Sequence, residues 1–102
     1  MSVEPSPNDL DRAAAARFLE RADRLFDEMI GQQHRKVLRL AREVLPHLSE
    51  EDLRNPYDFA ELKEHPTFEY EDGMLNGLIA AQIALRAEIR QLILPPEPRP
   101  EA

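Results

Sequence analysis

The side chains best suited to chemistry are four carboxylates in the middle of the chain. Glu61 and Glu64 form one pair at a helical spacing, and Glu69 and Asp72 repeat that spacing eight residues further on. Carboxylates three residues apart share one face of a helix, and hard divalent cations such as Mg²⁺ prefer oxygen ligands. The second pair, however, lies in a segment bounded by a proline and a glycine, where we expect a loop. A divalent-metal-dependent all-α hydrolase is therefore an alternative interpretation and not the leading one.

The other residues that commonly carry out catalysis form no recognisable site. The three histidines, His34, His47 and His65, share no helix face, so we expect surface or capping roles for them rather than a zinc triad. The chain has no cysteine, which excludes disulfides, thiolate-bound metals and a cysteine nucleophile. It also has no glycine-rich phosphate loop and no nucleophile elbow. We therefore predict a protein that is not an enzyme and that needs no cofactor.

Arginine is concentrated on one face of the first half of the chain. At about 100° per residue, six arginines fall within an arc of about 60° on a helix. We call this set the arginine face, and its members are Arg17, Arg21, Arg24, Arg35, Arg39 and Arg42. The planar guanidinium group suits bidentate contacts with carboxylates or phosphates, although a charged helix face is usually only solvated.

The negative charge is concentrated in residues 50–72. This segment holds nine acidic and two basic residues, and the difference of −7 equals the net charge of the whole chain. Its last acidic residues, Glu69, Glu71 and Asp72, are the candidates for contact with the arginine face. We therefore predict a non-enzymatic protein–protein interaction or regulatory module in which the arginine face docks on the acidic segment, within a homodimer or with another protein.

Nucleic-acid binding through the arginine face is a further alternative. The chain has a pI of about 4.9, whereas a dedicated nucleic-acid-binding protein is normally basic. No aromatic residue interleaves the arginines to stack on bases. We therefore do not expect nucleic acid as a partner.

A membrane is not expected as a partner either. No apolar run approaches the ~18 residues that span a membrane, and no secretory signal is apparent, so we expect a cytoplasmic protein.

The elements that position these residues are predicted to be helices. Ser6 and Pro7 suit the start of a helix that Pro46 ends, giving a first long helix over about residues 7–45 with Gly31 inside it. Apolar residues at steps of three and four predict one buried stripe along it and just beyond it. The stripe consists of Leu10, Ala14, Phe18, Ala22, Leu25, Met29, Val37, Leu40, Val44 and Leu48.

The second long helix is predicted over about residues 73–94 and is apolar or small on most of its surface. Gln82, Arg86 and Arg90 interrupt its apolar arc. A guanidinium group there needs a carboxylate partner, so we expect Arg86 to pair across the core with the acidic segment or with Asp23 and Asp27. Such a polar row more often fixes helix register than performs chemistry.

The segment between the long helices is expected to form two short helices and a loop. Six of its apolar and aromatic residues should reach the core: Leu53, Tyr57, Phe59, Leu62, Phe68 and Tyr70. The predicted fold is thus all-α, with a single helical domain over residues 7–94, as a helical hairpin or bundle. Residues 1–6 and the proline-rich residues 95–102 are expected to be disordered tails.

The length of the first helix predicts dimerisation. A continuous helix over residues 7–45 is about 58 Å long, whereas a compact domain of this size has a radius of gyration of about 13 Å. Either Gly31 bends the helix or its protruding half packs against a second chain. One glycine costs only about 1 kcal/mol inside a helix, so we favour a continuous helix in a homodimer.

Overall fold

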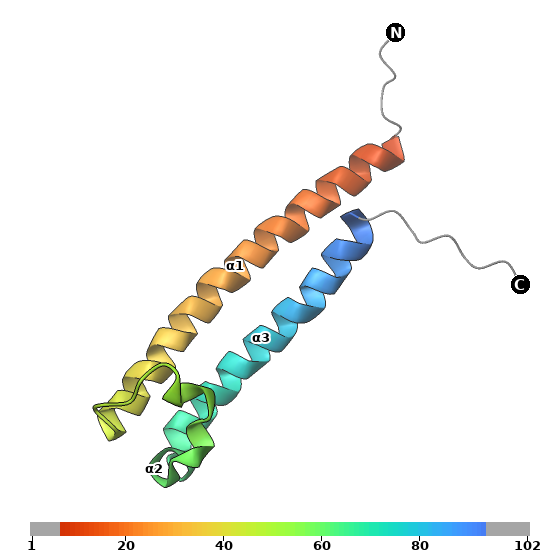
Figure 1. The fold of residues 1–102 in the computed structure, drawn as a ribbon. Coiled ribbons are helices and arrows are strands. Elements are labelled where there is room, and N and C mark those ends of the chain that lie inside the picture. Colours follow the sequence, from red (N-terminus) through yellow and green to blue (C-terminus); the bar gives the residue numbers. More distant parts are fainter. Residues whose placement is uncertain (1–6, 94–102) are drawn as a thin grey trace, which may run out of the picture.

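The computed structural model describes residues 7–93 and shows two long helices that lie side by side in opposite directions (Figure 1). Its elements, in chain order, are α1 (Pro7–Val44), the 3₁₀ turns η1 (Asp52–Arg54) and η2 (Pro56–Asp58), α2 (Ala60–Lys63) and α3 (Pro66–Ile93). No strand occurs among the described residues. The all-α prediction is therefore confirmed. We call the end at which η1, η2 and α2 join the long helices the closed end, and the opposite end the open end.

Helix α1 runs without a break from Pro7 to Val44 and ends one residue before the predicted end at residue 45, next to Pro46. Gly31 lies in its middle with ordinary helical backbone, and no described residue has a positive φ angle. The intrahelical hydrogen bonds of 38 residues outweigh the ~1 kcal/mol cost of one glycine. The helix therefore spans about 57 Å.

Helix α3 begins at Pro66, seven residues before the predicted start near Gly73. The loop predicted between this proline and Gly73 is therefore wrong, because proline is well tolerated in the first turn of a helix, where its missing N–H has no partner. His65 completes the start, because its Nδ1 accepts a hydrogen bond from the backbone N–H of Phe68 at 3.1 Å. Consequently Glu69, Glu71 and Asp72 are helical and do not lie in a loop.

The connection between the long helices consists of three short elements instead of the two expected. It starts at Ser49, whose hydroxyl accepts a hydrogen bond from the backbone N–H of Asp52 at 3.0 Å. The Asp52 carboxylate accepts one from the backbone N–H of Ser49, also at 3.0 Å. The hydrogen bond from the Ser49 backbone N–H, followed by that of the Ser49 hydroxyl, stabilises the charged Asp52 carboxylate and lowers its pKa below the ordinary value. The reciprocal pair is a capping arrangement in which each side chain accepts a hydrogen bond from the other residue's backbone N–H.

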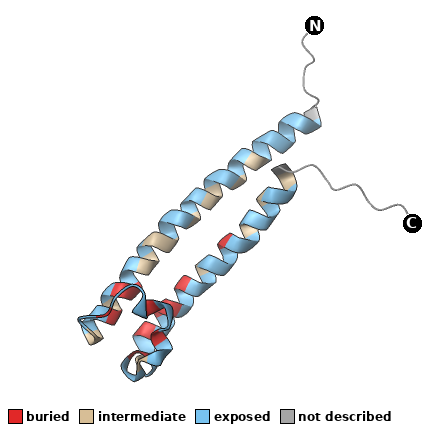
Figure 2. Cartoon of the chain, in the orientation of Figure 1, coloured by how far each residue is buried: buried red, intermediate tan, exposed pale blue. Residues whose placement is uncertain are grey.

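The hydrophobic core is confined to the closed end (Figure 2). Its buried members come from α1, the connection and α3, and they are Val37, Leu38, Ala41, Leu48, Leu53, Leu62, Phe68 and Leu75. The prediction that Tyr57 and Tyr70 reach this core is wrong, since both are exposed. Tyr70 lies on the same helix as the buried Phe68, and two residues along a helix turn a side chain by about 200° to the opposite face.

The long helices pack along one stripe each, which we call the packing stripes. Their members are buried or half-buried and recur at alternating steps of three and four, which is the pattern of a coiled coil. On α1 they are Leu19, Asp23, Phe26, Ile30, Gln33, Val37, Leu40 and Val44; on α3 they are Phe68, Glu71, Leu75, Leu78, Gln82, Leu85, Ile89 and Leu92.

The single buried stripe predicted for α1 is therefore wrong in its first half. Leu10, Phe18, Leu25 and Met29 belong to it by sequence, yet they are exposed. Both sets of residues follow steps of three and four, and the two sets lie about 90° apart around the helix. α3 covers only one of them.

The described chain is long and thin. Its principal extents are 66 × 35 × 20 Å and its Cα radius of gyration is 20.5 Å, against about 13 Å for a compact domain of this length. Neither long helix, nor any other described helix, combines the length and the apolar composition that crossing a membrane requires.

Candidate functional site

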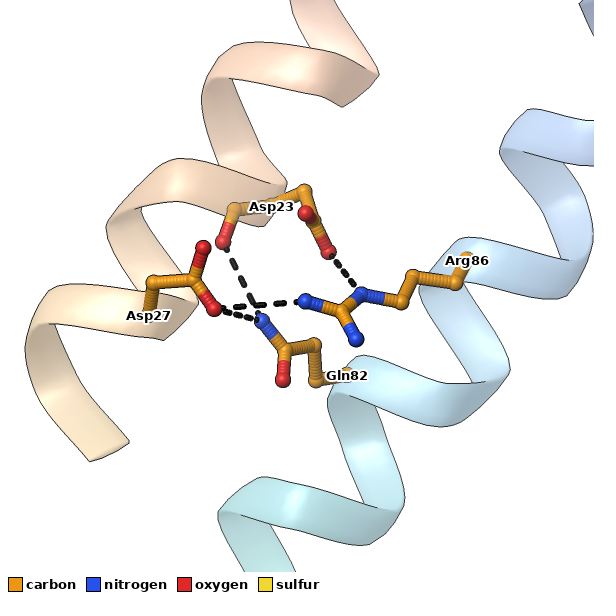
Figure 3. Close-up of polar contacts among 4 residues, drawn as sticks. All are labelled: Asp23, Asp27, Gln82 and Arg86. Atoms are coloured by element: carbon orange, nitrogen blue, oxygen red, sulfur yellow. Dashed lines mark hydrogen bonds and ion pairs between the residues drawn. The ribbon is translucent and has the colours of Figure 1, made fainter. Parts of the chain in front are cut away.

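A polar layer joins α1 to α3 halfway along the helix pair (Figure 3). The Gln82 side-chain amide is buried and donates to Asp27 Oδ1 at 2.6 Å and to the backbone carbonyl of Asp23 at 3.4 Å. Arg86 Nε donates to Asp23 Oδ1 at 3.0 Å, and its Nη2 lies 3.3 Å from Asp27 Oδ1. The expected pairing of Arg86 across the helices is thus present. The guanidinium side chain is 51% exposed, so the pair lies at the solvent edge of the helix contact.

A second polar layer lies nearer the closed end. Gln33 Nε2 donates to the carbonyl of Glu71 at 2.9 Å and to its carboxylate at 2.6 Å, while Lys36 Nζ lies 2.9 Å from the other carboxylate oxygen. The hydrogen bonds from Lys36 and Gln33 hold the pKa of Glu71 below its ordinary value. Buried polar groups are costly unless they are satisfied, so both layers penalise any sliding of α3 along α1.

The arginine face points away from α3. Its six members are all exposed, and within the described chain none of them makes an ion pair. Arg42 donates a hydrogen bond of 3.0 Å from its Nε to the carbonyl oxygen of Leu48. The acidic candidates lie elsewhere: Glu71 and Asp72 are buried against other groups, and only Glu69 is exposed. Within one chain the structure therefore does not bring the arginine face and these carboxylates together.

A cleft of about 800 Å³ opens at the closed end, lined among others by His34, Tyr57, Asp72 and Asn76. The buried Asp72 carboxylate accepts hydrogen bonds from Tyr57 Oη at 3.2 Å and from Asn76 Nδ2 at 3.4 Å. Burial, followed by the charge and hydrogen bond of Asp72, raises the pKa of Tyr57 above its ordinary value. Asp72 is thereby satisfied within the fold, and the cleft places no nucleophile against a base.

The carboxylates proposed for a metal-dependent hydrolase do not form a cluster. Glu61 belongs to α2 and Glu64 follows that helix, whereas Glu69 and Asp72 belong to α3. No group of three or more histidine, aspartate or glutamate side chains that could hold a metal ion occurs in residues 7–93. The described geometry gives the hydrolase alternative no support.

Three of the large apolar side chains that the described helices leave exposed lie on a second stripe of α1. We call this set the second stripe, and it consists of Asp11, Ala15, Phe18, Ala22, Leu25, Met29, Gln32 and Lys36. All members are exposed except the half-buried Ala22. Phe18, Leu25 and Met29 keep 72%, 56% and 41% of their surface exposed. Large apolar side chains gathered on one face of a helix commonly mark a protein contact.

The sequence contained the signal for this surface, but we did not separate it from the packing stripe. The second stripe follows steps of four and three from residue 11 to residue 36, and the packing stripe follows the same steps from residue 19 to residue 44. Counting both registers on one helix would have shown that α1 has two contact faces. Comparison of the chain with models of known protein families, with curated proteins and with solved structures finds no match.

Proposed function

We propose that this chain is a non-enzymatic interaction module that works as a homodimer, with the second stripe of α1 as the dimer contact. The observation that carries the proposal is the exposure of Phe18, Leu25 and Met29 on one face of α1. Burying such side chains is favourable by about 25 cal/mol per Å² of apolar surface. A second chain that covers this face supplies the burial that α3 leaves unmade.

The surface area of the chain supports the proposal. The accessible surface is 8354 Å², against about 5,900 Å² for a compact monomer of 11.8 kDa. The excess of about 2,400 Å² is three times the ~800 Å² that each partner contributes to a stable interface. A chain of this shape therefore has ample surface for a homodimer contact.

The arginine face is the part of the proposed module that contacts a further protein. It lies about 100° around α1 from the second stripe, so dimerisation through the stripe leaves it open to solvent. Its guanidinium groups have no carboxylate partner within the described chain, and they suit the carboxylates of an acidic protein surface. Of the acidic candidates in this chain, Glu71 and Asp72 are buried and only Glu69 is exposed, so we assign the contact to carboxylates of another polypeptide.

The dimer contact is tested by introducing a charge into the second stripe. We expect light scattering to give the parent chain about twice the 11.8 kDa mass of one chain, and Phe18→Glu and Leu25→Glu to lower it toward one chain. Ile83→Glu is the matched control: Ile83 is also exposed, at 64%, but lies on the Arg86 side of α3. It should leave the mass unchanged.

All three variants should keep the helical circular dichroism of the parent, because none of the three side chains belongs to the core. A parent chain with the mass of one polypeptide up to millimolar concentration would show that the proposed homodimer does not exist. Equal loss of mass in Ile83→Glu and Leu25→Glu would show that the second stripe is not the contact.

A further inference from the structure

We infer that the segment seated on the second stripe is the same stripe of a second copy, running antiparallel and in one defined register. The inference rests on the proposed homodimer and goes beyond it, because a dimer could equally form through α3, through the closed ends or with parallel helices. It is carried by the order of residues along the stripe and by the surface of α3 beside it.

The spacing of the second stripe is that of a coiled-coil seam. Successive members are four, three, four, three, four, three and four residues apart, which is the alternation of a and d positions in a heptad repeat. Asp11, Phe18, Leu25 and Gln32 occupy one heptad position, and the remaining four members occupy the other. A seam of this kind is completed by another helix with the same repeat, and α3 leaves Phe18, Leu25 and Met29 of this stripe exposed.

The charges at the two ends of the stripe favour the antiparallel direction. The stripe begins with Asp11 and ends with Lys36. An antiparallel pair places Asp11 opposite the partner's Lys36 at both ends, whereas a parallel pair in register places like charges opposite each other. Lys36 already contacts Glu71, and an ammonium group with three N–H donors has room for a second carboxylate.

The large side chains then fix the register. With the charged ends matched, Phe18 lies opposite the partner's Met29, and Ala22 lies opposite the partner's Leu25. Each layer combines the two heptad positions, and sulfur next to an aromatic ring is a favourable contact. Sliding one helix by a heptad in one direction sets Phe18 against the partner's Lys36. Sliding it in the other direction leaves Gln32 and Lys36 of each chain without partners in the stripe.

The neighbouring surface of α3 leaves space for the second copy. Small or apolar exposed residues recur there at steps of four and three: Tyr70, Met74, Gly77, Ala81 and Ala84. A side chain added at Gly77 would meet nothing within 4 Å. Small residues allow helices to approach closely, so this row leaves room for the second copy beside the second stripe.

The second stripe of α1 and the row of small residues on α3 lie on the same side of the helix pair. On α1 the second stripe lies about 180° from Asp27, and on α3 the small row lies about 120° or more from Arg86. Asp27 and Arg86 contact each other, so both stripes lie on the side away from that ion pair. Gln33 contacts Glu71 and Asp27 contacts Gln82, so residues 71–82 of α3 run beside Met29.

The absence of cysteine from the chain allows a direct test of this register. We propose single variants Ala15→Cys and Gln32→Cys, both at exposed positions, treated with a short bismaleimide alone and as an equimolar mixture. In the antiparallel register each residue 15 lies beside the partner's residue 32 and about 25 Å from the partner's residue 15. We therefore expect cross-linked dimers in the mixture and almost none with either variant alone.

Ala13→Cys mixed with Gln32→Cys is the matched control. Residue 13 is exposed but lies about 160° around the helix from residue 15, so this mixture should give no cross-linked dimer. Cross-linking of Ala15→Cys with itself would establish a parallel pair and overturn the inference. A dimeric mass without cross-links in the mixture would overturn the register while leaving the homodimer standing, whereas a monomeric mass would overturn both.

Discussion

At the scale of single residues, Glu71 is the side chain whose charge the fold uses most directly. Its carboxylate is bound by Lys36 and Gln33, which lowers its pKa. A carboxyl group with a lowered pKa in the fold stabilises the folded state at pH values above its ordinary pKa. That contribution is lost as the pH falls through the lowered pKa, because the folded state must then take up a proton that the unfolded state already holds.

Replacing Glu71 with glutamine should remove this pH dependence. We expect Glu71→Gln to lower the free energy of unfolding at neutral pH, and to lose less of it than the parent on acidification. Urea unfolding of both proteins at neutral and acidic pH measures how much the free energy of unfolding of each protein changes with pH. Glu69→Gln is the matched control, because Glu69 is exposed on the same helix turn. Identical pH dependence in the parent and Glu71→Gln would contradict the assigned role.

At the scale of elements, the continuity of α1 makes Gly31 an ordinary helical position. A Cβ atom there would approach only Arg35 Nη1, at 3.3 Å, which is the far end of a flexible side chain. We expect Gly31→Ala to raise the free energy of unfolding by about 0.5–1 kcal/mol, because alanine loses less backbone entropy in a helix. Gly73→Ala, which would meet nothing within 4 Å, should give a similar gain. Destabilisation by Gly31→Ala alone would show that α1 bends at this residue in solution.

The long elements were largely predictable, because proline punctuation and steps of three and four determine where helices begin and end. Helix α1 ends within one residue of the prediction. The early start of α3 was missed because His65 and Pro66 can either end a helix or begin one, and only the hydrogen bond from Phe68 to His65 decides between these outcomes. Likewise, the partners of Arg86 were among those expected, since a guanidinium in an apolar arc requires a carboxylate.

The choice of the buried face of α1 was not predictable from periodicity alone. Phe26 and Leu25 are adjacent and equally apolar, but they lie on different faces of α1, and α3 covers Phe26 and leaves Leu25 exposed. The covered face carries the matching polar groups, because Gln82 bonds to Asp27 and Glu71 accepts from Gln33. Such pairings connect residues far apart in the sequence, so a reading of one helix at a time cannot find them.

At the scale of the whole molecule, arginine gathers on one face of α1 and the excess of acidic residues lies elsewhere. The arginine face covers the outside of α1, while residues 50–72 near the closed end hold a charge equal to the net −7. A separated field of this kind can guide an acidic partner to α1 despite the negative net charge, and its reach shortens with added salt.

Reversing part of the arginine face tests this field. We expect the parent to bind polyglutamate at low ionic strength, and Arg35→Glu with Arg39→Glu to weaken that binding roughly tenfold or more through the loss of two positive and the gain of two negative charges. Arg54→Glu with Lys63→Glu changes the net charge equally, outside the face, and should weaken binding less. Equal losses in the two double variants, measured by fluorescence anisotropy, would show that only net charge matters.

The described chain starts and finishes at the open end, since α1 enters there and α3 leaves there (Figure 1). In the antiparallel pairing that we infer, the centre of the contact lies between residues 23 and 24 of α1. The first residues of the two α1 helices are then about 50 Å apart, at 1.5 Å per residue. The inferred pair would thus hold the first described residues of its two α1 helices at a fixed separation and facing outward.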